Sequence, residues 1–148
     1  MHSKRTLLAV AASILMLAAL APAVSATPRS GDIHIVKECS EFQGQAGGFC
    51  TITSSNVPAI PAGTRVIYLS ALADPYTVLD TDIVLDPPGP GNNKAFGHVV
   101  LNLVTGTGLV TFSGGTGVFT FFQATADVSY PGGYDWAWEG TYSFGSAS

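Results

Sequence analysis

Residues 106–130 read Gly106-Thr-Gly-Leu-Val-Thr-Phe-Ser-Gly-Gly-Thr-Gly-Val-Phe-Thr-Phe-Phe-Gln-Ala-Thr-Ala-Asp-Val-Ser-Tyr130, and residues 136–144 read Trp136-Ala-Trp-Glu-Gly-Thr-Tyr-Ser-Phe144. Both stretches alternate apolar with polar residues, and glycine-rich turns separate the alternating runs. A period of two residues is typical of β-strands that bury one face. The two stretches therefore decide the fold class, whereas no group of residues in them indicates a reaction by itself.

The same pattern extends back to residue 27, and no segment shows apolar residues at helical spacing over three turns. We expect strands over residues 32–42, 49–54, 64–72, 79–85, 95–104, 107–113, 117–130 and 134–145. The segments 56–63 and 86–93 are expected to be loops, because proline cannot donate to a strand ladder. Short strands with brief glycine turns predict one all-β domain, either an up-and-down antiparallel barrel or a sandwich.

The first residues of the chain have the three parts of a secretory signal peptide. Lys4 and Arg5 precede an apolar run over residues 7–20, and small residues lead up to Ala26. We expect cleavage after residue 26, so that the mature domain spans 27–148 and is secreted without membrane attachment. An uncleaved anchor is the alternative, but the apolar run is shorter than the ~20 residues that a spanning helix needs.

Charge argues against a nucleic-acid partner. The chain has six basic and ten acidic residues. Two of the basic residues, Lys4 and Arg5, lie in the predicted leader, which leaves four against ten and a formal net charge of −6. Because nucleic-acid binding depends on Lys and Arg neutralising phosphates, we expect no such partner.

Cys39 and Cys50 are the two cysteines of the chain. In an exported protein such a pair is expected to form a disulfide. A metal site or a nucleophilic thiol is the alternative, but no convincing histidine partner lies nearby in the sequence.

The glycines between residues 106 and 117 resemble a phosphate-binding loop, which needs a helix after it. We expect residues 118–123 to continue as a strand, which excludes a nucleotide site.

The run from Val110 to Val128 and the segment Trp138-Glu-Gly-Thr-Tyr-Ser-Phe144 look like the C-terminal half of allene oxide cyclase and dirigent barrel-like proteins. These proteins carry a Gly-Gly-Thr-Gly turn, an aromatic and small-residue strand and a final aromatic strand. The resemblance covers about residues 95–145 and is greatest to secreted bacterial members of unassigned chemistry. It implies an eight-stranded antiparallel up-and-down barrel with an internal cavity, often assembled as a trimer.

The cyclases of that family close an unstable fatty-acid epoxide in an apolar tunnel, and the dirigent proteins steer the coupling of phenoxy radicals. The cyclases place a carboxylate on their first strand, where this chain offers Glu38 and Glu41. A carboxyl group inside an apolar barrel has a raised pKa and can act as a general acid or base. Glu38 and Glu139 are therefore the candidate catalytic residues, with solvated or ion-paired strand glutamates as the alternative.

The last strand offers an aromatic wall. Its alternation places on one face Tyr134, Trp136, Trp138 and Tyr142, with Gly140 in the series. Such a face can stack on a flat apolar ligand. The alternatives are a barrel core, a subunit contact or, if the indoles are exposed, a sugar-binding platform. Gly140 either leaves a gap beneath a ligand or relieves crowding.

His98 and Asn102 share one face of the strand 95–104 and are candidates for the polar end of a ligand cavity, or else lie on the solvated outside. Asp80, Asp82 and Asp86 offer hard oxygen ligands, yet their spacing matches no calcium loop, so we expect no metal.

These features predict a secreted barrel that binds a small apolar or aromatic molecule in its lumen without a cofactor. Any catalysis is expected to be an isomerisation or cyclisation that depends on holding a reactive conformer. The alternative is a structural or interaction protein whose barrel is filled with side chains.

Overall fold

The computed structural model describes residues 29–145, and the predicted signal peptide lies outside the described residues. The elements in chain order are β1 (Ser30–Glu38), β2 (Phe49–Ser55), β3 (Arg65–Tyr68), β4 (Val78–Asp86), β5 (Ala95–Asn102), β6 (Thr107–Gly115), the 3-10 helix η1 (Gly117–Phe119), β7 (Gln123–Gly132) and β8 (Asp135–Ser143). Between residues 29 and 145, no helix has the length and apolar character needed to cross a membrane.

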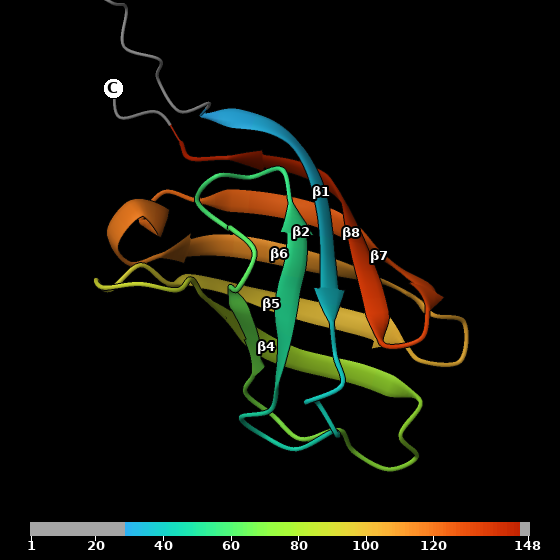
Figure 1. Ribbon diagram of the computed structural model, residues 1–148. Helices are drawn as coiled ribbons and strands as arrows, with labels where there is room; N and C mark the ends of the chain where they lie inside the picture. Colours follow the sequence, from blue (N-terminus) through green and yellow to red (C-terminus); the bar gives the residue numbers. More distant parts are fainter. Residues whose placement is uncertain (1–28, 146–148) are drawn as a thin grey trace, which may run out of the picture.

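Each strand pairs antiparallel with the next, and β8 pairs back with β1. The β1–β8 ladder runs from the pair Ser30 and Ser143 to the pair Glu38 and Asp135. Figure 1 shows blue β1 and red β8 side by side. The sheet is therefore closed on itself, which removes the free edges that an open sheet presents. The predicted eight-stranded antiparallel barrel is confirmed.

Alternate residues of each strand point into the barrel, and their side chains fill it. On β1 the inward residues are Ile33, Ile35 and Lys37, all buried, while their neighbours in the chain face outward. On β8 the indole of Trp138 is 1% exposed and packs against Phe112, with ring centroids 5.7 Å apart. The interior is thus packed with side chains, as is usual for a barrel of this strand number.

Aromatic rings close one end of the barrel, at the C-terminal end of β8. The ring centroids of Phe119 and Phe122 are 5.3 Å apart, and those of Phe122 and Phe144 are 4.9 Å apart. Phe119 and Phe122 are fully buried. Any opening to the interior therefore lies at the opposite end, where β1 ends and β8 begins.

The sequence-based expectation of a strand over residues 117–130 is wrong at its start. Residues 117–119 form the 3-10 helix η1, and β7 begins only at Gln123. Gly114 and Gly117 have φ of +80° and +58°, a conformation that glycine adopts at low cost. The chain reverses there and turns Phe119 and Phe122 into the barrel, so burial of two aromatic side chains replaces strand pairing.

Two further strands end four residues earlier than expected. The segment 32–42 ends as a strand at Glu38, because the chain turns directly after it: the Phe42 N–H donates a hydrogen bond of 3.1 Å to the Cys39 carbonyl. The segment 64–72 is a strand only over Arg65–Tyr68. Shortly beyond it, the Ser70 N–H bonds to the Thr81 hydroxyl at 2.9 Å instead of to a backbone carbonyl, which ends the ladder.

Candidate functional site

A pocket of about 600 Å³ lies at the open end of the barrel, which we call the mouth pocket. Its walls come from the β1–β2 loop, the β3–β4 connection, the β5–β6 turn and the β7–β8 turn. The thirteen residues that line it are Cys39, Phe42, Gln43, Gly44, Leu72, Leu103, Val104, Thr105, Gly106, Tyr130, Gly133, Tyr134 and Trp136. The pocket has the volume of a small-molecule site.

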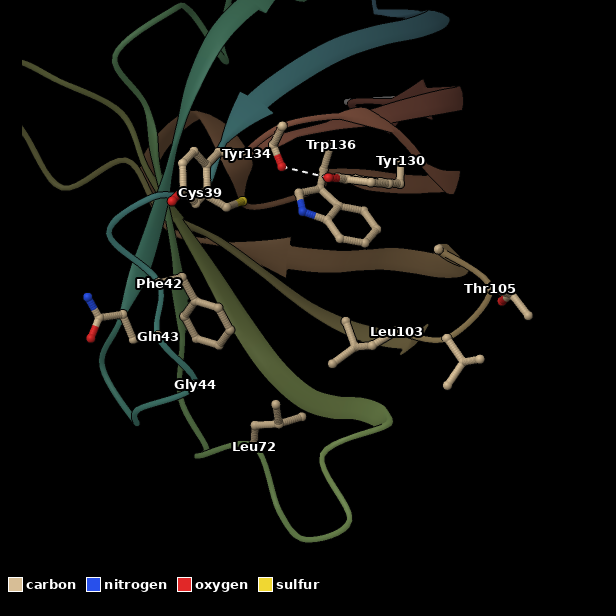
Figure 2. Close-up of a pocket in the computed structure, with 13 residues that line it drawn as sticks. Cys39, Phe42, Gln43, Gly44, Leu72, Leu103, Thr105, Tyr130, Tyr134 and Trp136 are labelled. Carbon is tan, nitrogen blue, oxygen red and sulfur yellow. Dashed lines mark hydrogen bonds between the residues drawn. The ribbon is translucent and has the colours of Figure 1, made fainter.

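Aromatic and aliphatic side chains face one another across the mouth pocket. Figure 2 shows Phe42 on one side and Trp136 with Tyr130 on the other, with Leu103 and Leu72 below them. The rings of Tyr130 and Trp136 pack with centroids 4.8 Å apart. The Tyr130 hydroxyl donates a hydrogen bond of 2.7 Å to the Gly133 carbonyl, which fixes the ring. These contacts hold an apolar surface in place before any ligand arrives.

Covalent and backbone bonds fix the β1–β2 loop that forms one wall of the mouth pocket. Cys39 and Cys50 form a disulfide, which confirms the prediction from the sequence. The Leu72 N–H donates a 2.8 Å hydrogen bond to the Gly44 carbonyl, tying this loop to the β3–β4 connection. Phe42 packs on Tyr68, with ring centroids 4.3 Å apart. The wall is therefore a fixed part of the barrel.

A smaller cavity of about 50 Å³ lies directly beneath the mouth pocket. Lys37, Cys50, Tyr68, Leu79 and Leu101 line it, together with four residues of the mouth pocket, namely Cys39, Phe42, Leu103 and Trp136. These four shared side chains form the boundary between the two spaces. The mouth pocket and the inner cavity are therefore neighbours along the barrel axis, with an amine at the inner end.

Lys37 is the unusual member of this arrangement, because it is a lysine only 2% exposed. Its Nζ donates a hydrogen bond of 2.5 Å to the Tyr68 hydroxyl and lies 4.6 Å from the centroid of the Trp138 ring. Among residues 29–145, no carboxylate lies within ion-pair distance of this amine. Burial disfavours the charged form and lowers the pKa of Lys37 to about 7.

Tyr68 shares this environment. Its side chain is almost fully buried, and burial raises the pKa of the phenol because the phenolate loses hydration. The Cys50 sulfur lies 3.3 Å from the same hydroxyl oxygen. Tyr68 therefore stays protonated, and its hydroxyl lies directly beside the Lys37 amine.

The sequence-based candidates missed Lys37, although the signal for it was present. Ile33, Ile35 and Lys37 are in phase on the first strand, so whichever face buries the two isoleucines also buries the lysine. The catalytic hypothesis required a carboxylate in the lumen and therefore pointed to Glu38, which lies on the opposite face of the strand.

The aromatic candidates of the last strand divide between the mouth and the core. Trp136 lines the mouth pocket, and Tyr134, 66% exposed, lies at its edge in the turn before β8. Trp138 and Tyr142 are buried in the interior, away from the mouth pocket. Trp138 is buried and Trp136 is partly buried, so neither indole has the mostly exposed face that a sugar-binding platform requires. Gly140 leaves no ligand gap, because a Cβ there would lie 2.0 Å from the Thr125 carbonyl oxygen.

The two glutamate candidates lie on the outer face of the barrel. Glu139 on β8 is exposed and contacts His34 Nδ1 on β1 through its carboxylate. Glu38 accepts a hydrogen bond of 2.6 Å from the Ser40 backbone N–H. Neither carboxylate lines the mouth pocket or the inner cavity. The interior carboxylate that the catalytic hypothesis needs is thus not supplied by these residues.

His98 and Asn102 also point outward. The Asn102 side chain accepts hydrogen bonds from the Val104 and Thr105 N–H groups, at 2.9 and 3.1 Å, and so shapes the β5–β6 turn. His98 lies between two aspartates, with Nε2 2.6 Å from Asp80 and Nδ1 2.8 Å from Asp82. Neither side chain lines the mouth pocket or the inner cavity.

The third acid of the possible calcium cluster lies elsewhere. Asp86 pairs with Lys94, with 2.9 Å between Oδ1 and Nζ. Across residues 29–145, no three His, Cys, Asp or Glu side chains gather in a way that can hold a metal ion. The three aspartates thus do not form one site.

The hydrogen bond to Asp82, with the Asp80 bond and the charges of both acids, raises the pKa of His98 above its ordinary 6.5. We expect a ¹H–¹⁵N NMR titration of the imidazole to give a midpoint above 6.5. Asp82→Asn is expected to lower that midpoint more than Asp80→Asn does, because the hydrogen bond to Asp82 is the largest cause of the raised pKa of His98. A wild-type midpoint at or below 6.5 would contradict the bonded geometry.

The fold and the site together define a closed antiparallel barrel with a plugged end, a filled interior and an apolar pocket at its open mouth. Comparison of the chain with protein-family models, with curated proteins and with solved structures finds no match. The resemblance to allene oxide cyclase and dirigent barrel-like proteins, and the trimer that it implies, therefore stay predictions.

Proposed function

We propose that this protein binds a small apolar or aromatic molecule, and that the mouth pocket is its binding site. The observation that carries the proposal is the fixed apolar lining, in which Phe42, Leu103 and Trp136 face a space of about 600 Å³. Apolar pockets with a few polar groups are the usual form of small-molecule sites. The proposed site differs from the sequence-based hypothesis in its position, at the mouth of the barrel and not along its lumen.

The chemistry of the lining supports an uncharged ligand. Within the described residues, none of the thirteen side chains that line the mouth pocket is charged. Gln43, Thr105 and the two tyrosines supply polar atoms, whereas Trp136 and Phe42 offer ring faces. A flat ring can stack on such faces with little loss of side-chain entropy, because the rings are held by their neighbours. We therefore propose an aromatic or aliphatic molecule without a charged group.

The test is a fluorescence titration with N-phenyl-1-naphthylamine, a flat apolar probe whose emission rises on leaving water. Trp136→Ala is expected to weaken binding by about tenfold or more, because truncating a buried aromatic contact costs roughly 1.5 kcal/mol or more. Phe121→Ala is the matched control, since Phe121 is 62% exposed and lies beyond η1 at the plugged end. Equal affinity in all three proteins would contradict the proposal.

The alternative is a structural or interaction protein without a small ligand, and the filled interior favours it. Trp138 and Phe112 occupy the space that a lumen ligand would need. In that case the mouth pocket binds neither the probe nor any other apolar molecule. Absence of probe binding to wild-type protein would therefore support the alternative.

A further inference from the structure

The structure brings together a buried amine and an apolar site, and the following inference rests on the proposed function of the mouth pocket. We propose that Lys37 forms a Schiff base with an apolar aldehyde whose body lies in the mouth pocket and whose carbonyl group enters the inner cavity. The substrate class is a small uncharged molecule that ends in a formyl group. The new site is thus the inner cavity, with Lys37 Nζ as its reacting atom.

The position of Lys37 supports this assignment. Its side chain lines the inner cavity, whose boundary with the mouth pocket consists of Cys39, Phe42, Leu103 and Trp136. A cavity of about 50 Å³ has room for a terminal carbonyl group but not for a ring. The ring or chain of the ligand would therefore remain in the mouth pocket.

The protonation state of the Lys37 amine also supports Schiff-base formation. A lysine is a nucleophile only when it is neutral, and apolar burial without a counter-ion favours the neutral form. The pKa of Lys37 near 7 means that about half of the molecules carry the neutral amine at neutral pH. The Trp138 ring and the Tyr68 hydroxyl hold Nζ in place. Most surface lysines at this pH are protonated and react slowly.

The reaction balances without a further reactant. The Nζ lone pair adds to the carbonyl carbon, and one amine proton moves to the carbonyl oxygen to give a carbinolamine. Tyr68 is within reach to relay the proton that completes the loss of water. Its hydroxyl gives a proton to the departing hydroxyl as it takes the remaining N–H proton, so that water leaves, a C=N bond forms and no phenolate is left. The products are the imine and one water molecule.

A carboxylate ligand is a poorer fit than an aldehyde. Most of the side chains that line the inner cavity are apolar, and Lys37 is the one cationic residue among them. A carboxylate that entered the cavity would lose its hydration and gain only an ion pair with protonated Lys37. Such an exchange is often unfavourable in a dry interior. An aldehyde is neutral and requires no such desolvation.

The chain provides its own control for a labelling experiment. Within residues 29–145 the only other lysine is Lys94, which is partly exposed on the outside and paired with Asp86. The full chain is incubated at pH 7 with 3-phenylpropanal and sodium cyanoborohydride, which reduces an imine to a stable secondary amine. Peptide mass spectrometry then measures the label on each lysine and on the N-terminus.

We expect Lys37 to be labelled at least tenfold faster than Lys94, with a rate that rises as the pH increases through about 7. Lys37→Met should remove this fast phase, whereas Lys94→Met should leave it unchanged. Excess 3-phenylpropanol, which has no carbonyl group, should slow the labelling of Lys37 by occupying the mouth pocket.

The outcomes separate this inference from the proposed function. If 3-phenylpropanol binds but Lys37 is not labelled faster than Lys94, the Schiff base is wrong and the binding site stands. If neither compound interacts with the protein, the proposed function fails as well. Fast labelling of Lys37 that the alcohol does not slow would contradict the route through the mouth pocket.

Discussion

Lys37→Met is expected to raise the free energy of unfolding at pH 6 by on the order of 5 kcal/mol. Burial lowers the pKa of Lys37 from 10.5 to about 7, and each pKa unit corresponds to about 1.4 kcal/mol. At pH 6 the wild-type protein must bury an ammonium group that has no carboxylate partner within residues 29–145. Methionine has a similar length and carries no charge, so the variant avoids this cost.

The pH dependence follows from the direction of the shift. Below pH 7 the folded and unfolded chains both carry the Lys37 proton, and the burial cost is fully present. Between about pH 7 and 10.5 the unfolded chain binds more protons than the folded chain, so stability rises with pH. Tyr68 acts in the opposite direction, because its raised pKa lets the unfolded phenol ionise first above about pH 10. The rise is therefore expected between pH 7 and 10.

Urea unfolding at several pH values between 6 and 10 measures this rise. Wild-type protein and Lys94→Met are expected to become more stable over that range. Lys37→Met is expected to lack this rise in the free energy of unfolding. The difference between the wild-type and Lys37→Met pH curves therefore gives the contribution of the buried amine, separate from those of His98 and the surface groups. An equal rise in Lys37→Met would show that another group causes it.

Removal of the disulfide, by Cys39→Ala together with Cys50→Ala, is expected to cost about 3 kcal/mol of stability. The cysteines are separated by 11 positions, and closing a loop of this length lowers the entropy of the unfolded chain. For a domain of this size the midpoint of thermal unfolding should fall by roughly 10 °C or more. Differential scanning calorimetry measures it.

The same double variant should weaken binding at the mouth, because Cys39 lines the mouth pocket and anchors the β1–β2 loop. Ser40→Ala, a change on the same loop outside the pocket lining, is the control. A midpoint within 2 °C of wild type, with unchanged probe affinity, would mean that hydrogen bonds alone fix this wall.

The fold could be predicted from the sequence because alternation and turn glycines agree over most strands. The period of two correctly placed Trp136, Trp138 and Tyr142 on one face of β8, but it did not show that this face is the inward one. The prediction of a strand directly after Gly115 was wrong for a physical reason. Phe119 and Phe122 are apolar at strand-like spacing, yet they gain more by plugging the end of the barrel than by extending a ladder.

The site was harder to predict. Strand alternation shows which residues share a face but not which face is inward when both carry apolar residues. Glu38 and Lys37 are adjacent, and only closure of the barrel shows that the lysine is the buried one. The mouth pocket combines four connections that lie far apart in the sequence, so no local pattern indicates it.

Binding of an apolar molecule at the mouth pocket can be measured residue by residue with ¹H–¹⁵N NMR of the labelled protein titrated with 3-phenylpropanol. We predict saturable shifts at the amides of Gly44, Leu103 and Trp136, which line the mouth pocket, and little change at Phe121 or at His98 on the outer face. Absence of saturable shifts, or shifts centred on the outer surface around His98, would contradict binding at the mouth pocket.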